Sequence, residues 1–245
     1  IAGIFNQTAD KILFPFLFDD KAYANEQLGI YGACFKIAVV MVMFTQAFRY
    51  AYEPFIFARN KSDDNKLAYA EAMKYFILFA LFIFLGVMFY IDILKYFVGP
   101  AYYPGLRVVP IVMLGELFFG IYFNLSLWYK LIDETRWGAY FSSIGCVATV
   151  TIILLFGSTY GYMACAWASF CCNLLMMVLS YFMGQRKYPI NYDLRSAAIY
   201  TALATVLYVA GMCLPIESII GRLAYRTRLL AVYAGFMWKR DLMRY

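Results

Sequence analysis

The segment spanning residues 28–57 constrains the fold more than any other part of this sequence. It is apolar and long enough to cross a bilayer, whose hydrocarbon core takes about 20 residues of helix. It nevertheless contains Lys36, Arg49 and Glu53, and a proline, Pro54, near its end. Ionised side chains at membrane depth are costly and face the interior of a helix bundle or a water-filled cavity. The segment therefore predicts a membrane helix with charged side chains that need polar surroundings.

The rest of the chain shares this apolar character. Of its 245 residues, 64% are hydrophobic, and the mean hydropathy is +0.66, whereas a soluble domain averages about 45–50% apolar residues. This composition predicts an all-α integral membrane protein with about eight transmembrane helices, each long enough to cross the hydrocarbon core. The apolar segments span residues 1–18, 28–57, 75–94, 106–129, 137–157, 160–184, 194–214 and 216–238.

The sequence offers little support for catalytic chemistry. It has no histidine, which removes imidazole general bases and His-ligated zinc. Its six cysteines fall in apolar runs without C-x-x-C spacing, so we expect them to be small buried side chains. Phosphate-binding glycine loops and nucleophile motifs are absent from the sequence. We therefore expect that the protein is not an enzyme and has no catalytic residues, no metal and no cofactor.

Basic residues predict the orientation of the chain in the membrane. They concentrate near residues 59–66, 130–136 and 186–195 and in the C-terminal tail, and they are sparse in the opposite loops. Because Lys and Arg accumulate in cytoplasmic loops, this distribution places the C-terminus in the cytoplasm. Trp128 and Trp137 fall at the same boundary, as residues of an interfacial belt do. The net charge of +6 thus indicates orientation, and we expect no nucleic-acid partner.

Two interpretations are open for the charges of residues 28–57. Arg49 and Glu53 lie four residues apart and can pair on one face of a helix, whereas Lys36 points about 100° or more away from both. In one interpretation Lys36 reaches a headgroup and the Arg49–Glu53 pair is structural. In the other, all of them line a polar lumen. Pro54 removes a backbone hydrogen bond and is expected to kink the helix.

Further polar groups interrupt the other apolar segments. Asp10 and Lys11 are neighbours and face different directions, and with Asn6 and Gln7 they form a polar patch in the first segment. This patch either lines a functional path or belongs to a structural network with another helix. Glu116 is a lone carboxylate in the outer half of the fourth segment. It is either a proton or cation site or the partner of a basic residue on a neighbouring helix.

The last apolar segment, residues 216–238, contains Arg222, Arg226 and Arg228. We expect this segment to span the membrane, because a helix lying flat on the outer surface would leave the basic tail outside. Arg222 and Arg226 lie four residues apart on one face. The expected role of both is to extend toward lipid headgroups.

Several motifs of this chain resemble those of one known family. They are NQTADKILFPFL at residues 6–17, AYEPF at residues 51–55, YFNLSLWYK at residues 122–130, and Thr135 before the fifth segment. They are similar to features of bacterial O-antigen and capsule translocases. These are the polysaccharide-repeat flippases of the multidrug/oligosaccharidyl-lipid/polysaccharide exporter superfamily. The likeness covers essentially the whole chain.

The resemblance implies a two-lobed transporter, of which this chain is the C-terminal part. Residues 1–184 would form the second six-helix lobe, and residues 185–245 would form two additional transmembrane helices and a cytoplasmic tail. A parallel-repeat transporter of this kind holds its substrate between the lobes, near the membrane midplane. The N-terminal lobe of the same chain, which this sequence lacks, is therefore an expected partner.

The resemblance also implies a substrate, a location and site residues. The substrate would be an undecaprenyl-diphosphate-linked oligosaccharide repeat unit, flipped across the bacterial inner membrane by alternating access for O-antigen (lipopolysaccharide) or capsule biosynthesis. Expected partners are this lipid-linked oligosaccharide, membrane lipids and the polysaccharide polymerase machinery. A diphosphate needs cations to bind it. The expected substrate-binding residues are Lys11, Lys36 and Arg49, and the expected coupling or structural partners are Asp10, Glu53 and Glu116.

Two other functions stay open. A cation-coupled multidrug exporter of the same superfamily would favour an acidic and aromatic lining, and the excess of lysine and arginine in the first two segments argues against it. A membrane-embedded glycosyltransferase or polymerase of the same pathway usually needs a large outward catalytic loop, whereas the outward loops of this chain are short.

Overall fold

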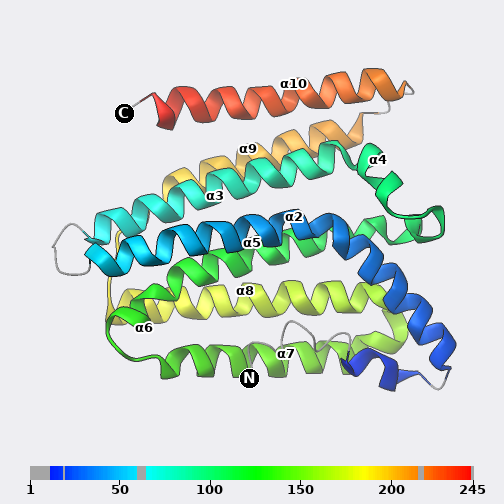
Figure 1. Ribbon diagram of the computed structural model, residues 1–245, viewed down its shortest axis with the longest axis horizontal. Helices are drawn as coiled ribbons and strands as arrows, with labels where there is room; N and C mark the ends of the chain where they lie inside the picture. Colours follow the sequence, from blue (N-terminus) through cyan, green and yellow to red (C-terminus); the bar gives the residue numbers. More distant parts are fainter. Residues whose placement is uncertain (1–11, 19, 60–64, 215–217, 244–245) are drawn as a thin grey trace.

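The structure is a computed structural model that describes residues 12–18, 20–59, 65–214 and 218–243. Throughout these residues the only regular elements are helices (Figure 1), which confirms the all-α fold class. The elements are η1 (Phe14–Leu17), α2 (Lys21–Arg59), α3 (Asn65–Phe89), α4 (Ile91–Leu94), η2 (Lys95–Phe97), η3 (Pro100–Val108), α5 (Val109–Leu125), α6 (Leu127–Leu131), α7 (Arg136–Tyr160), α8 (Tyr162–Lys187), α9 (Leu194–Cys213), α10 (Ile219–Met237) and η4 (Trp238–Leu242).

Six spans in the described part of the chain are long and apolar enough to cross a membrane. They lie in α2, α3, the run from η3 through α6, α7, α8 and α9. Helix α10 is not one of them, because arginines interrupt its apolar sequence. The first predicted segment lies mostly outside the described residues, so the expectation of about eight crossings is not tested there.

The long helices lie roughly side by side (Figure 1). Helix α5 packs against both α2 and α8, and α8 packs against α7. On the other side of α2 lies α3, which contacts α9 and α10. Helices α9 and α10 therefore join the bundle through α3, at the edge away from α7 (Figure 1).

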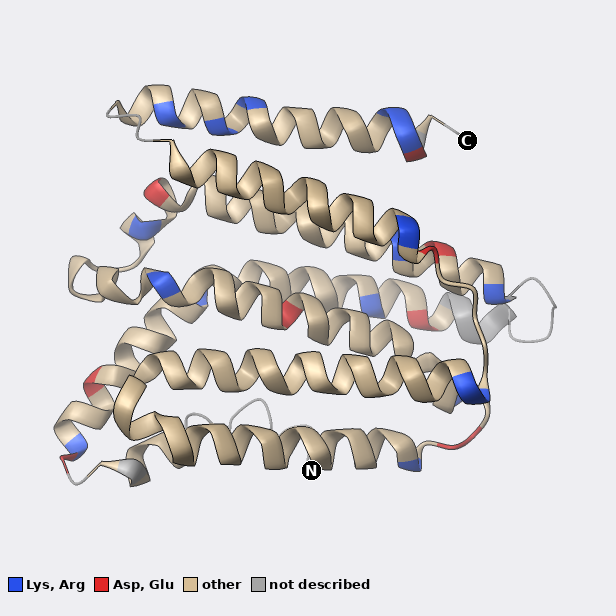
Figure 2. Ribbon diagram, turned by 180° about the vertical axis from the view of Figure 1, so that it is seen from behind, with Lys and Arg blue, Asp and Glu red and all other residues tan. Residues whose placement is uncertain are grey.

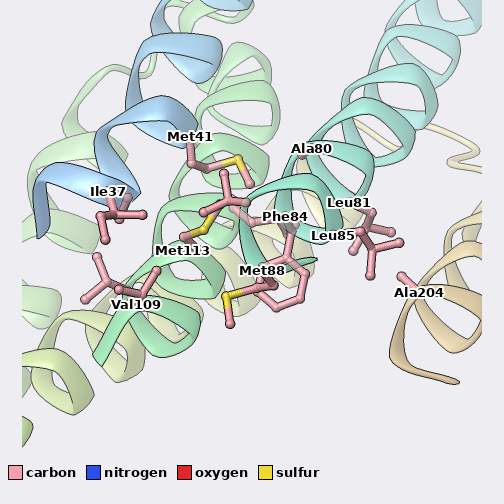
Figure 3. Close-up of a cluster of buried hydrophobic side chains, with 14 of the residues drawn as sticks. Ile37, Met41, Ala80, Leu81, Phe84, Leu85, Met88, Val109, Met113 and Ala204 are labelled. Atoms are coloured by element: carbon pink, nitrogen blue, oxygen red, sulfur yellow. The ribbon is translucent and has the colours of Figure 1, made fainter. Parts of the chain in front are cut away.

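Apolar side chains from several helices meet in the largest core. Met41 of α2, Met113 of α5, and Phe84 and Met88 of α3 point toward one another (Figure 3), and all four are buried. The Phe76 ring of α3 packs directly on Gly120 of α5 in the same core, because a Cβ atom on Gly120 would lie 2.2 Å from Cζ of Phe76. Membrane helices use such small residues to approach closely, since lipid supplies no hydrophobic force between them.

Charged residues gather toward the two ends of the bundle and are sparse along the middle of the helices (Figure 2). This distribution is typical of a membrane protein, whose polar loops lie in water while the helix centres lie in hydrocarbon. Two of the charged clusters hold α10 in place, one around Arg226 and one around Asp241.

Arg226 anchors the N-terminal half of α10. Its guanidinium donates hydrogen bonds to Asp92 Oδ2 at 2.8 Å, to the Gly211 carbonyl at 3.0 Å and to the Phe89 carbonyl at 3.2 Å. Arg222 adds an ion pair to the same Asp92 at 3.4 Å. Arg226 is only 5% exposed. The prediction that it extends toward lipid headgroups is therefore wrong: the arginine crosses a helix interface and satisfies two helix-terminal carbonyls.

Asp241 anchors the other end, where α10 continues into η4. It is buried and accepts hydrogen bonds from Lys74 of α3 and Tyr200 of α9. Next to it, Arg240 donates to Ser196 Oγ at 3.0 Å. The arginine-rich α10 is thus held against α3 and α9 by polar clusters near both of its ends.

Candidate functional site

The site residues predicted from the sequence fall into two groups in the structure. Asp10 and Lys11 lie outside the described residues. Lys36, Arg49, Glu53 and the adjoining Pro54 all belong to α2, and Glu116 belongs to α5. Helix α2 packs against α5, and Arg49 contacts Phe123 of α5, whereas no contact joins Lys36 or Glu116 to Arg49 among the described residues.

Lys36 lies on a face of α2 that the described residues leave uncovered. Its side chain is exposed, as are those of Val40, Met43 and Tyr50 further along the helix. Exposed positions spaced by three or four residues form one continuous stripe on a helix. The described residues form no ion pair with Lys36. Within the described part of the chain, Lys36 is therefore an unpaired cation on the exposed face of α2.

Arg49 lies beside this stripe and is held by aromatic rings. Its Cζ atom is 4.8 Å from the ring centroid of Phe123 in α5 and 5.3 Å from that of Tyr50. A guanidinium over a ring face gains electrostatic energy from the ring's quadrupole without losing its charge. Its Nε atom is buried and has no hydrogen-bond partner among the described residues. Arg49 thus has one buried donor that no described residue pairs with.

A small hollow lies between α2, α3 and α5, and Arg49 and Glu53 both line it. Thr45 and Asn124 also contribute to its wall. The Thr45 hydroxyl is buried and unpaired within the described part of the chain, while Asn124 Nδ2 donates to the Gly120 carbonyl at 3.1 Å. The volume of about 10 Å³ is close to the space that one water occupies. The hollow therefore has room to solvate Arg49 Nε and the Thr45 hydroxyl together.

Glu53 pairs with Lys130 and not with Arg49. Lys130 Nζ lies 2.5 Å from Glu53 Oε1, and the two residues are 77 positions apart in the sequence. The described residues show no ion pair between Arg49 and Glu53, so the proposed bridge within α2 does not form. No feature of the sequence indicated Lys130 as the partner, because the contact depends on how α6 folds against α2.

The roles expected for Glu116 and Pro54 stay predictions. The Glu116 side chain is partly buried and forms no ion pair with any described residue. Pro54 lies inside α2, which continues to Arg59. The visible bend of α2 in Figure 1 lies in its N-terminal half, away from the end that carries Pro54.

A second ion pair lies at the same end of the bundle. It joins the turn between α6 and α7 to the end of α8. Lys187 donates to Glu134, and Trp137 Nε1 donates to the same carboxylate at 2.6 Å. These bonds, that of Lys187 first, lower the pKa of the Glu134 carboxyl below its ordinary value. The ammonium group of Lys187 also lies 5.1 Å from the Trp137 ring centroid. Sequence reasoning missed this cluster.

An apolar cavity of about 360 Å³ lies between α3, α5, α8 and α9. Met73 and Ile77 of α3 and Met177 and Phe182 of α8 contribute to its wall. Apolar cavities of this size suit hydrocarbon ligands. Its polar edge, at Asp193, lies near the end of the bundle that carries Lys130 and Lys187.

The fold and these features define a class of protein: an all-helical, multi-pass membrane protein with six spans long and apolar enough to cross a bilayer in the described part of the chain. No family model matches the sequence, and no curated protein matches it. The structure is similar to that of the lipid II flippase MurJ in the inward closed conformation, with a TM-score of 0.69 and 14% sequence identity. The match covers 99% of this chain and 52% of that one.

The similarity to MurJ therefore assigns a flippase fold. It supports the expected all-helical fold, since the chain matches about half of that structure over nearly its whole length. The chain spans about half the length of that structure. The more specific resemblance to polysaccharide-repeat flippases is not shown by the similarity to MurJ.

Proposed function

We propose that this chain is the C-terminal part of a flippase for undecaprenyl-diphosphate-linked oligosaccharide repeat units of a surface polysaccharide, the O-antigen or a capsule. The observation that carries the proposal is Arg49, a cation on a membrane helix that the described residues leave without a carboxylate partner. A diphosphate headgroup carries the complementary charge, and a guanidinium can bind two of its oxygens in parallel.

In this proposal the substrate headgroup passes along the open face of α2. Arg49, Lys36 and Lys11 bind the diphosphate, and Asp10 and Glu116 couple its movement to a cation or proton. Glu53 takes the structural role. The apolar cavity beside α3 and α8 offers hydrocarbon surface for the lipid part. Reduced water near the helices strengthens each charge–charge contact relative to the protein surface.

The assembly follows from the same proposal. Residues 1–184 form the second lobe, residues 185–245 add two transmembrane helices and a cytoplasmic tail, and an N-terminal lobe completes the cavity for alternating access. The protein lies in the bacterial inner membrane, surrounded by membrane lipids, and delivers its substrate to the polysaccharide polymerase machinery.

A second candidate function is cation-coupled drug export. Glu116 favours it, because this partly buried carboxylate has no ion pair among the described residues and such groups bind cations or protons in membranes. Glu116→Gln would abolish transport of a cationic dye under this alternative, whereas Arg49→Gln would have little effect on it.

The flippase proposal is tested with the natural full-length protein in proteoliposomes. A fluorescent undecaprenyl-diphosphate oligosaccharide is added, and its movement between leaflets is followed by quenching from the outside. We expect transport by the wild type and a loss of about tenfold or more in Arg49→Gln, because a hydrogen bond to a charged group contributes about 1.5–3 kcal/mol. Arg195→Gln, at an exposed arginine of α9, is the matched control and should transport normally. Absence of transport by the wild type would refute the proposal.

A further inference from the structure

The position of Glu53 poses a problem for any anion site at Arg49. The two residues lie four apart in α2, a spacing at which a carboxylate and a guanidinium can meet on one face of a helix. A carboxylate in that position would compete with a phosphate for the same donors, because both bind the guanidinium through paired oxygens. An anion site at Arg49 therefore requires that Glu53 be held elsewhere.

In the structure, Lys130 holds the Glu53 carboxylate. Glu53 Oε1 accepts a hydrogen bond from Lys130 Nζ at 2.5 Å. Lys130 lies in the short helix α6, which follows α5. Meanwhile the Arg49 guanidinium rests over Phe123 at 4.8 Å, and its Nε has no hydrogen-bond partner within the described part of the chain. Glu53 of α2 thus pairs with Lys130 of α6 and not with Arg49 of its own helix.

The residues around Lys130 fix its position. Trp128 and Tyr129 precede it and are only 1% and 7% exposed. Trp128 Nε1 also donates to Ser180 Oγ of α8 at 3.3 Å. Because α6 is seated by two buried aromatic side chains, Lys130 is presented to Glu53 from a rigid support. Long lysine side chains lose much conformational freedom when they pair, so a fixed backbone favours the contact.

We propose that Lys130 is a positioning residue: by pairing with Glu53 it keeps this carboxylate away from Arg49 and leaves the guanidinium free to bind a diphosphate. The inference rests on the proposed function for its ligand, but the choice of partner by Glu53 does not. Loss of Lys130 lets Glu53 turn to Arg49 and occupy the anion site from within the same helix.

The test compares single and double variants. The full-length protein is placed in nanodiscs of phosphatidylcholine, and binding of undecaprenyl diphosphate is measured by native mass spectrometry. We expect Lys130→Gln to weaken binding about tenfold, comparable to the loss of a charge-assisted contact. Glu53→Gln should bind at least as well as the wild type, and the double variant Lys130→Gln with Glu53→Gln should recover binding.

Lys187→Gln is the matched control, because Lys187 also pairs with a glutamate at the same end of the bundle. It should bind as the wild type does. A double variant as weak as Lys130→Gln would overturn the inference, since Lys130 would then touch the ligand or only support the fold. Wild-type binding by Lys130→Gln would overturn it as well.

A second measurement tests, without any substrate, whether Lys130 keeps Glu53 from pairing with Arg49. Phenylglyoxal modifies free arginine side chains, and the modification of Arg49 can be followed by peptide mass mapping. We expect slower modification of Arg49 in Lys130→Gln and recovery in the double variant. Equal rates in all variants would refute the pairing switch. If the wild type binds undecaprenyl diphosphate no better than uncharged undecaprenol, the proposed function fails, while the modification rates still report on Lys130.

Discussion

At the scale of single residues, the choice of partner decides which charges are available. Arg49 faces aromatic rings, Glu53 faces Lys130, and Lys36 faces away from the described residues. A spacing of four residues does place Arg49 and Glu53 near each other on a helix, as the sequence suggested. The pair does not form because a third residue competes for the same carboxylate.

Arg49→Lys separates charge from geometry at this residue. Lysine keeps the positive charge but loses the planar fork that binds two phosphate oxygens together. We expect transport of the lipid-linked oligosaccharide to fall between those of the wild type and Arg49→Gln, with normal abundance in the membrane. Initial transport rates in proteoliposomes provide the measurement. Full activity in Arg49→Lys would show that charge alone suffices.

The Glu134 cluster predicts a dependence of stability on pH. The pKa of Glu134 is lowered in the folded protein, so its contribution is present above the ordinary carboxyl pKa of about 4.3 and is lost as the pH falls through the folded value. We expect Glu134→Gln to lower the melting temperature slightly at pH 7. The difference from the wild type should shrink toward acid pH. A difference that grows on acidification would contradict the role of the ionised carboxylate.

At the scale of elements, α10 shows how a helix with several arginines can pack within a membrane bundle. Arg226 places its charge beside Asp92 and its remaining donors on the carbonyls of Phe89 and Gly211. Lys74 of α3 reaches Asp241 beyond its other end. Buried charges are tolerated when they are both paired and hydrogen-bonded. Helix α10 therefore depends on α3 and α9 for its place.

Arg226→Gln should release this helix. Glutamine cannot reach all three acceptors, so Phe89 and Gly211 lose donors and Asp92 loses a cation. We expect a destabilisation of about 1.5–3 kcal/mol, the range for hydrogen bonds to charged groups, and faster proteolysis near residue 218. Arg228→Gln, at an exposed arginine of the same helix, is the control. Denaturation in detergent measures both variants, and equal effects would contradict the anchoring role.

At the scale of the whole molecule, the bundle is similar to about half of the MurJ structure, and most of its charged residues lie toward the two ends of the bundle (Figure 2). Helices α9 and α10 lie beside α3, at the edge away from α7 (Figure 1). This arrangement leaves one face of α2 uncovered by the described residues.

The charge distribution predicts which end lies in the cytoplasm. Arg186→Cys, at an exposed position in the last turn of α8, should resist a membrane-impermeant thiol reagent in intact cells, because basic helix ends and loops stay inside. Ala101→Cys, at the opposite end and exposed, should react. Both variants are made in a background without the native cysteines. Comparable labelling at the two positions would contradict a cytoplasmic C-terminus.

The sequence by itself determined the helical membrane class, the positions of most helices and the concentration of charge at their ends. Hydrocarbon imposes these features locally, because every backbone polar group must be paired within a helix and every apolar run must be long enough to cross. A single sequence could also place Lys36 and Arg49 on a membrane helix, since helical periodicity is a local property.

Only the tertiary structure decided which charges meet. Glu53 with Lys130, Arg226 with Asp92, and Lys74 with Asp241 are separated by 77, 134 and 167 residues. A lysine or arginine can reach any of several carboxylates, and the partner is chosen by which helices pack together and how they are rotated. These properties depend on side-chain shape across the whole interface. For this reason α10 could be predicted as a helix, but its buried arginine could not be predicted as its anchor.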